Sequence, residues 1–521
     1  MKHNLFAFRL IILSLFLTIG CTNKNKVPML ITVEPAQEGS RSVLMEAIKK
    51  AAEQPERPTI IRLTKGVYHL YADSADKHQY YASNTASEKE NPDPTRRIAL
   101  WIRKINNLTI DGQGSSLMLH GEQTALVIDS CRDVLIKDLT IDMFDPTVPE
   151  MTVVETGPGY MIADVHPSSQ YEIVNGRLRW KGVNWSFEDG IAQLYDPKQN
   201  STWRSFAPQT NAKQVTELSE RKLRFDFAQT PDVQIGQTFQ MRDGIRDELC
   251  GLITHSADVS FSNVICRFMG NFSILSQLSE NISYTDCEFA PDSIGGRTNS
   301  SFADMLHFSG CKGEINIKNC HFSGAHDDPV NVHGTHLKVI EFPTRQLARV
   351  RFMHPQSYGF EAFSKGDEIE IVDAKSLLPV ATNRIARVTR ENNYDLLLTF
   401  EHEIPSSVLL NPNLVIENIT LTPEVTISDC TFERVPTRGI LISTRKKVVI
   451  ERNIFFRMKM SAILIADDAR SWYESGPVHD VTIRDNQFIE CGEPVIWIHP
   501  ENETTEGPVH KNIVITNNRF K

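Results

Sequence analysis

The amino-acid sequence predicts an all-β protein, a right-handed parallel β-helix that carries two small inserted β-barrel-like domains. Three observations indicate this fold. A strand motif recurs at intervals of 23 to 33 residues, Asn or Asp residues follow its strands, and two long stretches lack it. The motif is clearest in seven segments: 259–268, 282–289, 315–322, 425–432, 448–455, 481–488 and 513–520.

Each copy of the motif alternates apolar and polar residues, as in the segment 425–432, which reads Val-Thr-Ile-Ser-Asp-Cys-Thr-Phe. This period of two indicates a strand with one buried face. A single short strand cannot bury its face alone, but stacked coils share a continuous core. Cys287, Cys320 and Cys430 occupy the same place in the motif, so we expect small buried side chains there. The sequence has no Cys-x-x-Cys pair, so a structural zinc site is not expected.

The remaining elements follow from where the motif stops. Apolar residues at helical spacing in 42–52 predict a helix that caps the open end of the stack. Two stretches alternate like antiparallel strands, and insertions of this kind often emerge on the binding face. We expect a leader at 1–20, a cap with the first coils at 21–147, an inserted β domain at 148–250, central coils with the site at 251–336, a second inserted β domain at 337–423, and C-terminal coils at 424–521.

The N-terminus has the pattern of an export signal. Lys2, His3 and Arg9 precede an apolar run at 10–19, and Gly20-Cys21 follows. The run is shorter than the ~20 apolar residues that span a bilayer. Cys21 is the candidate lipid anchor, which predicts an exported protein tethered to a bacterial membrane, at the periplasm or the cell surface, by lipid alone. Thr18 departs from the aliphatic residue usual before such a cysteine, and a plain signal peptide is the alternative.

The net charge of the 521 residues is -10. An acidic chain argues against a nucleic-acid partner, because phosphate binding needs a basic surface. A neutral sugar is compatible with this charge. No pattern predicts a cofactor or a bound metal, and none indicates the oligomeric state.

Two stretches of the central coils concentrate carboxylates. Aligning Leu306 with Val330 places Asp304 one coil from Asp328, with Asp327 beside it. Neighbouring strands lie ~4.8 Å apart, so all three would reach one bound sugar. Crowded carboxylates should raise at least one pKa, which leaves an acid beside a base, as glycoside hydrolysis requires. A solvated turn and a Ca²⁺ site are the alternatives.

The same alignment extends to residues around this trio. Matching Ile440 with Val330 puts Arg438 above Asp328, where it would keep that carboxylate ionised or bind a sugar hydroxyl; a solvated arginine is the alternative. Other candidates for hydroxyl binding or ring stacking are His307, His326, His333, Trp203, Tyr195 and Trp472. For each of the three histidines, packing against a strand without a role in sugar binding is an equally supported alternative.

Asp304 and the run 324–334 (Gly-Ala-His-Asp-Asp-Pro-Val-Asn-Val-His-Gly) resemble the catalytic region of glycoside hydrolase family 110, the bacterial exo-acting α-1,3-galactosidases. The resemblance covers nearly the whole mature chain. It implies an inverting removal of terminal α-1,3-linked galactose from blood-group-B-type or linear glycans. It also implies that Asp327 is the general acid and that Asp304 and Asp328 activate water. A similar trio occurs in polygalacturonases, inverting hydrolases on the same fold.

Other functions on this fold remain alternatives at this point. Another β-helix glycoside hydrolase would use the same carboxylates on a different sugar. A polysaccharide lyase would need a basic residue beside a uronate and usually Ca²⁺, whereas the central strands offer aspartates. A glycan-binding lipoprotein would place aromatic residues at the centre and would bind without cleaving.

Overall fold

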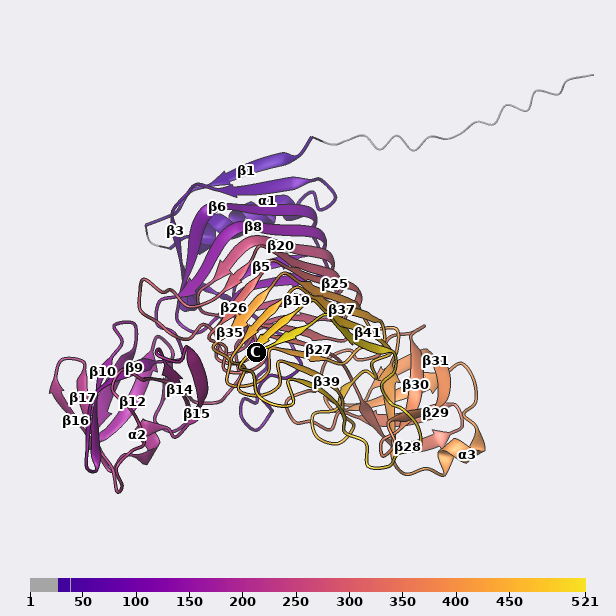
Figure 1. Cartoon of the computed structure of the whole chain (residues 1–521). Coiled ribbons are helices and arrows are strands. Elements are labelled where there is room, and N and C mark those ends of the chain that lie inside the picture. The colour runs from indigo at the N-terminus through magenta and orange to yellow at the C-terminus, as the bar shows by residue number, and fades with distance from the viewer. Residues whose placement is uncertain (1–26, 38) are drawn as a thin grey trace, which may run out of the picture.

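The computed structural model describes residues 27–37 and 39–521. The predicted leader and Cys21 lie outside the described residues. Successive coils stack into two long, mainly parallel sheets that run from the N-terminal cap to the C-terminus (Figure 1). The fold class expected from the repeat is therefore confirmed.

The larger sheet has eighteen strands. They are β1 (Met29–Val33), β2 (Thr59–Leu63), β3 (Val67–Tyr71), β6 (Asn106–His120), β8 (Arg132–Met143), β20 (Ala257–Cys266), β22 (Glu280–Thr285), β23 (Glu288–Phe289), β25 (Lys312–Lys318), β26 (His321–Ser323), β34 (Glu424–Ser428), β35 (Thr431–Glu433), β37 (Lys447–Glu451), β38 (Ile454–Phe456), β41 (Asp480–Arg484), β42 (Gln487–Ile489), β44 (Ile513–Thr516) and β45 (Arg519–Phe520). These strands contain all seven copies of the motif.

The second sheet has eleven strands and carries the site. They are β4 (Asp76–Gln79), β5 (Thr95–Arg103), β7 (Thr124–Asp129), β19 (Gly251–Thr254), β21 (Ile274–Gln277), β24 (Leu306–Ser309), β27 (Val330–Thr335), β36 (Ile440–Ile442), β39 (Ile463–Asp467), β43 (Ile496–Pro500) and the short antiparallel β40 (Glu474–Ser475). Helix α1 (Arg41–Ala52) buries Leu44, Ala47, Ile48 and Ala51 against the first coils, as its apolar spacing predicted. A 3₁₀ turn, η1 (Ala72–Ser74), follows β3.

The turns between coils explain the recurring Asn and Asp. Asp286, Asn319, Asp429 and Asp485 all adopt positive φ at the end of a motif strand. Asn and Asp tolerate this left-handed conformation better than other residues that have a Cβ. The chain can therefore turn sharply in each coil without a glycine.

The core of the stack repeats one residue type per coil. Rings of consecutive coils stack 4.8 to 5.1 Å apart along a phenylalanine ladder made of Phe289, Phe322, Phe432, Phe455, Phe488 and Phe520. This spacing matches the distance between paired strands. Cys287, Cys320 and Cys430 are buried and unpaired, as expected.

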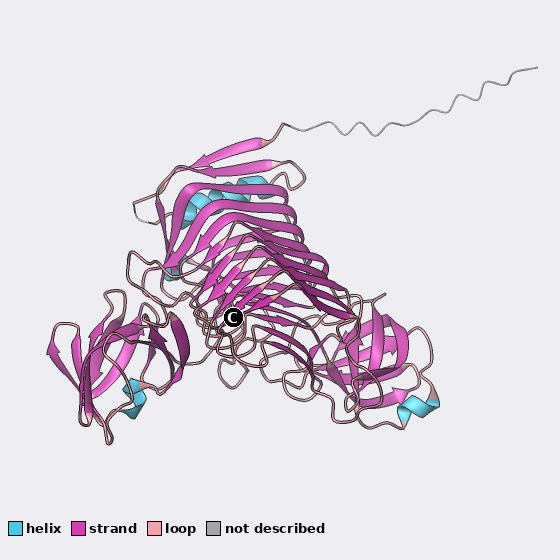
Figure 2. Cartoon of the chain, in the orientation of Figure 1, coloured by secondary structure: helices cyan, strands magenta, loops and turns pink. Residues whose placement is uncertain are grey.

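Two antiparallel units interrupt the stack, and Figures 1 and 2 show them on opposite sides of it. The first contains a seven-stranded sheet and a three-stranded sheet around one core. Its elements are β9 (Glu150–Gly157), β10 (Tyr160–Val165), β11 (Gln170–Val174), β12 (Arg177–Gly182), β13 (Trp185–Phe187), β14 (Ile191–Asp196), β15 (Ser201–Ser205), α2 (Pro208–Asn211), β16 (Gln214–Ser219), β17 (Lys222–Asp226) and β18 (Thr238–Arg242).

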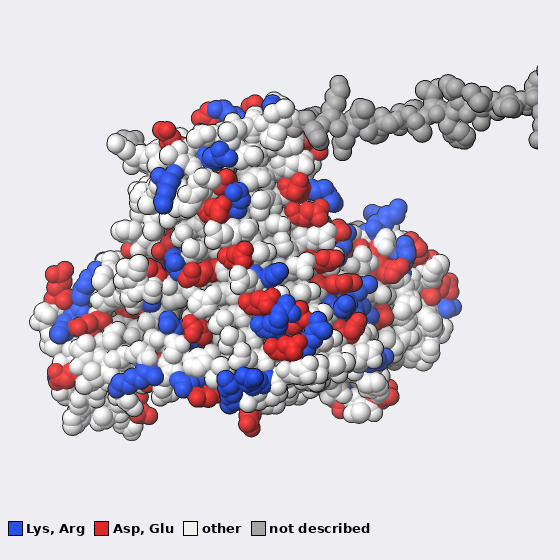
Figure 3. Space-filling model, turned by 45° about the horizontal axis from the view of Figure 1, so that its top comes forward, with Lys and Arg blue, Asp and Glu red and all other residues white. Residues whose placement is uncertain are grey.

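The second unit is a closed six-stranded barrel. Its elements are β28 (Leu337–Thr344), β29 (Leu347–Arg351), β30 (Glu368–Asp373), β31 (Leu378–Arg390), β32 (Asp395–Phe400), α3 (Ser406–Leu409) and β33 (Leu414–Asn418). No helix among the described residues is long and apolar enough to cross a bilayer. Positive and negative side chains are interspersed on the face drawn in Figure 3, which therefore has no basic patch suited to phosphate.

Candidate active site

The register of the second sheet brings the three aspartates together. Leu306 pairs with Val330 and Phe308 with Val332, as the alignment predicted. Asp304 thus precedes β24, while Asp327 and Asp328 precede β27 in the next coil. Two backbone hydrogen bonds tie these turns: the Asp327 amide donates to the Ala303 carbonyl (3.2 Å), and the Met305 amide donates to that of Asp328 (3.3 Å).

The trio opens into a cavity of about 360 Å³. This volume is within the ~300–1,000 Å³ typical of small-ligand sites. Its lining residues are Asn84, Arg204, Arg246, Asp304, Asp327, Asp328, Asn331, Arg438, Leu441, Met460, Trp472 and Glu474. The wall is therefore polar and charged, with a few apolar groups at positions where a sugar ring could pack.

Asp327 is the carboxylate that the arginines hold ionised. Its Oδ2 lies 2.7 Å from Arg246 Nη2, and its Oδ1 lies 3.8 Å from Arg438 Nη2. Burial raises the pKa of Asp327, but the positive charges of Arg246, Arg438 and two further arginines outweigh it and bring the pKa below its ordinary value.

Asp328 forms a bidentate ion pair with Arg438 of the next coil. Arg438 Nε donates to Oδ1 at 2.9 Å, and Nη2 lies 2.9 Å from Oδ2. Arg438 thus lies where the alignment of Ile440 with Val330 placed it. Burial nevertheless raises the pKa of Asp328 to about 7, because desolvation outweighs the stabilisation from Arg438.

Asp304 is almost completely buried, at 3% exposure. Burial, and then the charge of Asp327, raise its pKa to about 8, while Arg246 opposes the shift. A raised pKa was expected from crowding of the carboxylates, but desolvation is the larger cause for both Asp304 and Asp328. Near neutral pH, Asp304 therefore favours its protonated form, Asp328 is close to its own pKa, and Asp327 carries negative charge.

The three histidines considered for hydroxyl binding are not among the residues that line the cavity. His307, His326 and His333 are at most 2% exposed. His326 Nε2 lies 2.9 Å from Gln240 Oε1, within the wall between the coils and the first insertion. His307 and His333 lie behind Asp304. Both ring nitrogens of His307 and of His333 contact protein groups.

Several cavity residues were not found from the sequence. Arg246 lies in the charged run 242–248 between the first insertion and β19, and that run was an available signal. Arg204 on β15, Asn84 in the N-terminal segment and Glu474 on β40 come from irregular regions that carry no repeat. Of the three aromatic candidates for ring stacking, only Trp472 lines the cavity.

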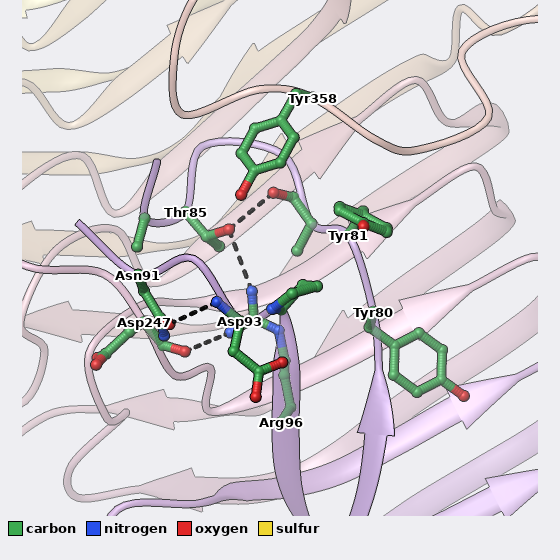
Figure 4. Close-up of a pocket in the computed structure, with 11 residues that line it drawn as sticks. Tyr80, Tyr81, Thr85, Asn91, Asp93, Arg96, Asp247 and Tyr358 are labelled. Atoms are coloured by element: carbon green, nitrogen blue, oxygen red, sulfur yellow. Dashed lines mark hydrogen bonds between the residues drawn. The ribbon is translucent and has the colours of Figure 1, made fainter. Parts of the chain in front are cut away.

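A second hollow, shown in Figure 4, is lined by Arg96 and by Asp247, the residue that follows Arg246. Arg96 Nη1 donates to the Asp247 carbonyl at 2.6 Å, and Nη2 donates to Thr85 Oγ1 at 3.1 Å. The Ala86 amide donates to the Arg246 carbonyl at 2.9 Å. At about 20 Å³ the hollow accommodates about one water and no sugar. The hydrogen bonds beside it fix the backbone of Arg246 and Asp247, and Arg246 contacts Asp327.

Family models match three parts of the chain. GLAA-B beta-barrel domain I matches residues 149–238, GLAA-B beta-barrel domain II matches 348–410, and the right handed beta helix region matches 416–521. Among solved structures, the tailspike protein of the E. coli bacteriophage HK620, in complex with a pentasaccharide, is 10% identical. It covers 94% of this chain and 55% of its own, with a TM-score of 0.38. That similarity is too low to say anything about function.

Relatives with assigned activities match over most of their length. Alpha-1,3-galactosidase A of Bacteroides thetaiotaomicron is 47% identical, over 94% of this chain and 86% of the relative. Alpha-1,3-galactosidase A of Bacteroides fragilis is 40% identical, over 89% and 78%. Alpha-1,3-galactosidase B of Bacteroides thetaiotaomicron is 33% identical, over 96% and 83%. The chain therefore belongs to the α-1,3-galactosidase family, glycoside hydrolase family 110.

Proposed function

We propose that this protein is an exo-acting glycoside hydrolase that removes terminal α-1,3-linked galactose from glycans with inversion at the anomeric carbon. The observation that carries the proposal is the trio Asp304, Asp327 and Asp328 in one cavity, brought together by the register of β24 and β27. Carboxyl groups that face one bound sugar can supply the acid and the base of an inverting hydrolase.

In the proposed reaction, Asp327 protonates the leaving oxygen, and Asp304 and Asp328 activate the attacking water. The free protein has the opposite proton distribution, with Asp327 charged. Once substrate enters, Asp327 must therefore gain a proton and the base must be ionised. The three carboxyls titrate as one coupled system, so the proton count of the trio matters more than any single pKa.

Exo-action is supported by the construction of the cavity. Its walls come from the N-terminal segment, the first insertion and the segment after it, four coils and the segment around β40. Walls on this many sides favour a pocket for a chain end over a groove along which a polymer lies. Trp472 and Met460 are 40% and 43% exposed, which suits them to contact the sugar next to the cleaved bond.

Leaving-group dependence tests the roles of the trio. Asp327→Asn is expected to lose about 10²–10⁴-fold in kcat/KM on an α-1,3-galactosyl disaccharide. It should retain much more activity on an aryl α-galactoside, whose leaving group needs little protonation. Asp304→Asn and Asp328→Asn should lose activity on both substrates. If one of these two spared the aryl substrate instead, that aspartate and not Asp327 would be the acid.

The finer substrate preference is part of the proposal. Blood-group-B-type branched trisaccharides and linear ones differ by one fucose beside the cleaved galactose. The ratio of kcat/KM for the two trisaccharides measures the preference. Hydrolysis of neither, by a folded protein, would contradict the substrate class.

We also propose that the protein is exported and lipid-anchored through Cys21. The charged start, the apolar run 10–19 and the Gly20-Cys21 pair support this. Mass spectrometry of the N-terminal peptide should find an acylated Cys21, and Cys21→Ser should release the protein into the detergent-free fraction. An unmodified, internal Cys21 would contradict the anchor.

A further inference from the structure

Asp304 is the first member of a hydrogen-bonded chain that leads away from the cavity. Its Oδ2 lies 2.7 Å from His307 Nδ1. His307 Nε2 lies 2.8 Å from His333 Nε2, and His333 Nδ1 lies 2.6 Å from the Gly334 carbonyl oxygen. His333 Nε2 is also 3.6 Å from Glu474 Oε1. Both imidazoles are buried, so protein atoms alone decide where their hydrogens sit.

The carbonyl at the end of the chain restricts these hydrogens. A carbonyl oxygen only accepts, so His333 must carry its hydrogen on Nδ1. The 2.8 Å contact between the two Nε2 atoms needs one hydrogen between them. When both rings are neutral, that hydrogen is on His307, whose Nδ1 is then bare. The 2.7 Å contact with Asp304 then requires the proton to be on the Asp304 carboxyl.

Two other arrangements satisfy the same contacts with the same number of hydrogens. In the first, the Asp304 proton stays on His307 Nδ1, which leaves a carboxylate beside a cationic His307; burial opposes this by lowering the pKa of His307 well below its ordinary value. In the second, the positive charge passes on to His333. Asp304 gives its Oδ2 proton to His307 Nδ1, and His307 gives its Nε2 proton to His333 Nε2. One O–H bond and one N–H bond break while two N–H bonds form. The result is a carboxylate on Asp304, a neutral His307 and a cationic His333. Loss of the proton to solvent would instead leave the two Nε2 atoms facing each other without a hydrogen.

We propose that His307 and His333 form a proton relay that allows the buried Asp304 to become a carboxylate, with Glu474 as counter-ion of the protonated His333. The relay rests on the proposed function, in which Asp304 serves as base. His307, His333 and Glu474 are positioning residues, because they act on water only through Asp304.

The charges around the chain suit this transfer. Asp327, Asp328, Arg246 and Arg438 face the Asp304 end from the cavity side. At the other end Glu474 faces His333. Glu474 Oε1 lies 3.6 Å from His333 Nε2 and accepts a 2.7 Å hydrogen bond from Asn84 Nδ2. A carboxyl group therefore lies where the cation would form.

Among the described residues, the side chains packed around His307 exclude other proton acceptors, so a proton that reaches His307 can pass only to His333 or return to Asp304. The Phe272 ring lies 5.1 Å from that of His307, and the guanidinium of Arg246 lies 5.2 Å from the Phe272 ring. Burial lowers the pKa of His307 well below its ordinary value, so it transmits a proton without retaining one. His333 is the histidine whose Nε2 lies 3.6 Å from the Glu474 carboxylate.

The relay predicts a specific pH signature. Because the proton moves inside the protein, activity of the wild type does not require Asp304, with a pKa of about 8, to lose its proton to solvent. His333→Gln removes the receiving nitrogen. The acid limb of its kcat/KM profile should move toward pH 8. We expect roughly 10- to 100-fold less activity near pH 6 and recovery toward the wild-type level at high pH. Glu474→Gln should shift the same limb by a smaller amount.

His326→Gln is the matched control. His326 is as buried as His333, lies in the turn before β27, and is not part of the hydrogen-bonded chain from Asp304 to His333. This variant should leave the acid limb in place. A His333→Gln profile with an unmoved limb, or one reduced equally at every pH, would overturn the relay.

Nitrogen NMR of histidine-labelled protein provides a readout without turnover and separates failure of the relay from failure of the proposed function. In Asp304→Asn, the Asn amide can donate to His307 Nδ1 and hold the neutral arrangement. We expect the Nδ1–H tautomer on His333 and the Nε2–H tautomer on His307. Two histidines with the same tautomer would break the chain and contradict the relay, whatever the substrate.

Discussion

The phenylalanine ladder and the aspartate turns are built on the same coils. Along the ladder, Phe322, Phe432 and Phe455 place the same ring at the same position in successive coils. In the turns before β24, β27 and β36, successive coils instead carry Asp304, the pair Asp327-Asp328 and Arg438. Identical apolar rings gain from stacking at ~5 Å, whereas identical charges at that spacing repel. Repetition therefore builds the fold, and departure from repetition builds the site.

A second ladder shows how far repetition tolerates exchange. Asn453 Nδ2 donates to the Ile427 carbonyl at 2.9 Å, and Asn486 Nδ2 donates to that of Ile450 at 2.9 Å. At the same place in an earlier coil, Cys320 Sγ reaches the Tyr284 carbonyl at 3.6 Å. Asn and Cys therefore serve one backbone acceptor, and neither alters the register.

The largest expected effect breaks the ladder inside the stack. Phe432→Ala should cost about 3–5 kcal/mol of unfolding free energy, because it leaves a void between two stacked rings. Phe520→Ala at the open end is the control, since Phe520 is 55% exposed. Chemical denaturation measures both. Equal losses would show that the ladder does not act through buried stacking.

The next effect breaks the turn. Arg438→Ala removes the partner of the buried Asp328 carboxyl, which can take up a proton instead of remaining an unpaired charge, so the expected cost is about 1–3 kcal/mol. Arg438 lowers the pKa of Asp328, so without it that pKa should rise further and the pH profile of kcat/KM should shift upward. Comparison with Arg434→Ala, outside the cavity, controls for loss of an arginine. Unchanged activity and an unchanged pH profile would exclude a role for Arg438.

A third effect is a change in how stability depends on pH. An unfolded Asp titrates near pH ~4, whereas folded Asp304 has a pKa of about 8. Between these values the folded protein keeps a proton that the unfolded chain has lost, so this group's contribution to stability falls as pH rises and is lost above about pH 8. Asp304→Asn replaces the titrating carboxyl by a neutral amide, so this decrease in stability with rising pH should disappear. Its Tm should match the wild type near pH 4 and exceed it at pH 8. A difference that does not grow with pH would contradict the buried, protonated carboxyl.

The periodic part of the molecule could be predicted from the sequence, and the rest could not. Alternation and spacing fix the register, which is why the proximity of Asp304, Asp328 and Arg438 followed from alignment alone. Arg246, Glu474 and Asn84 reach the cavity on irregular segments, whose paths depend on tertiary contacts such as that of Arg96 with the Asp247 carbonyl. The burial of His307 and His333 was also hidden, because spacing does not reveal which polar residues are covered.

The most direct test of the account follows the anomeric proton of galactose by NMR during hydrolysis of an α-1,3-galactosyl trisaccharide. Inversion by Asp327 as acid and Asp304 with Asp328 as base predicts that β-galactose appears first and then mutarotates. The signal should be absent with Asp304→Asn and with Asp328→Asn. Initial release of α-galactose, or wild-type rates from either variant, would contradict the assignment of these three aspartates.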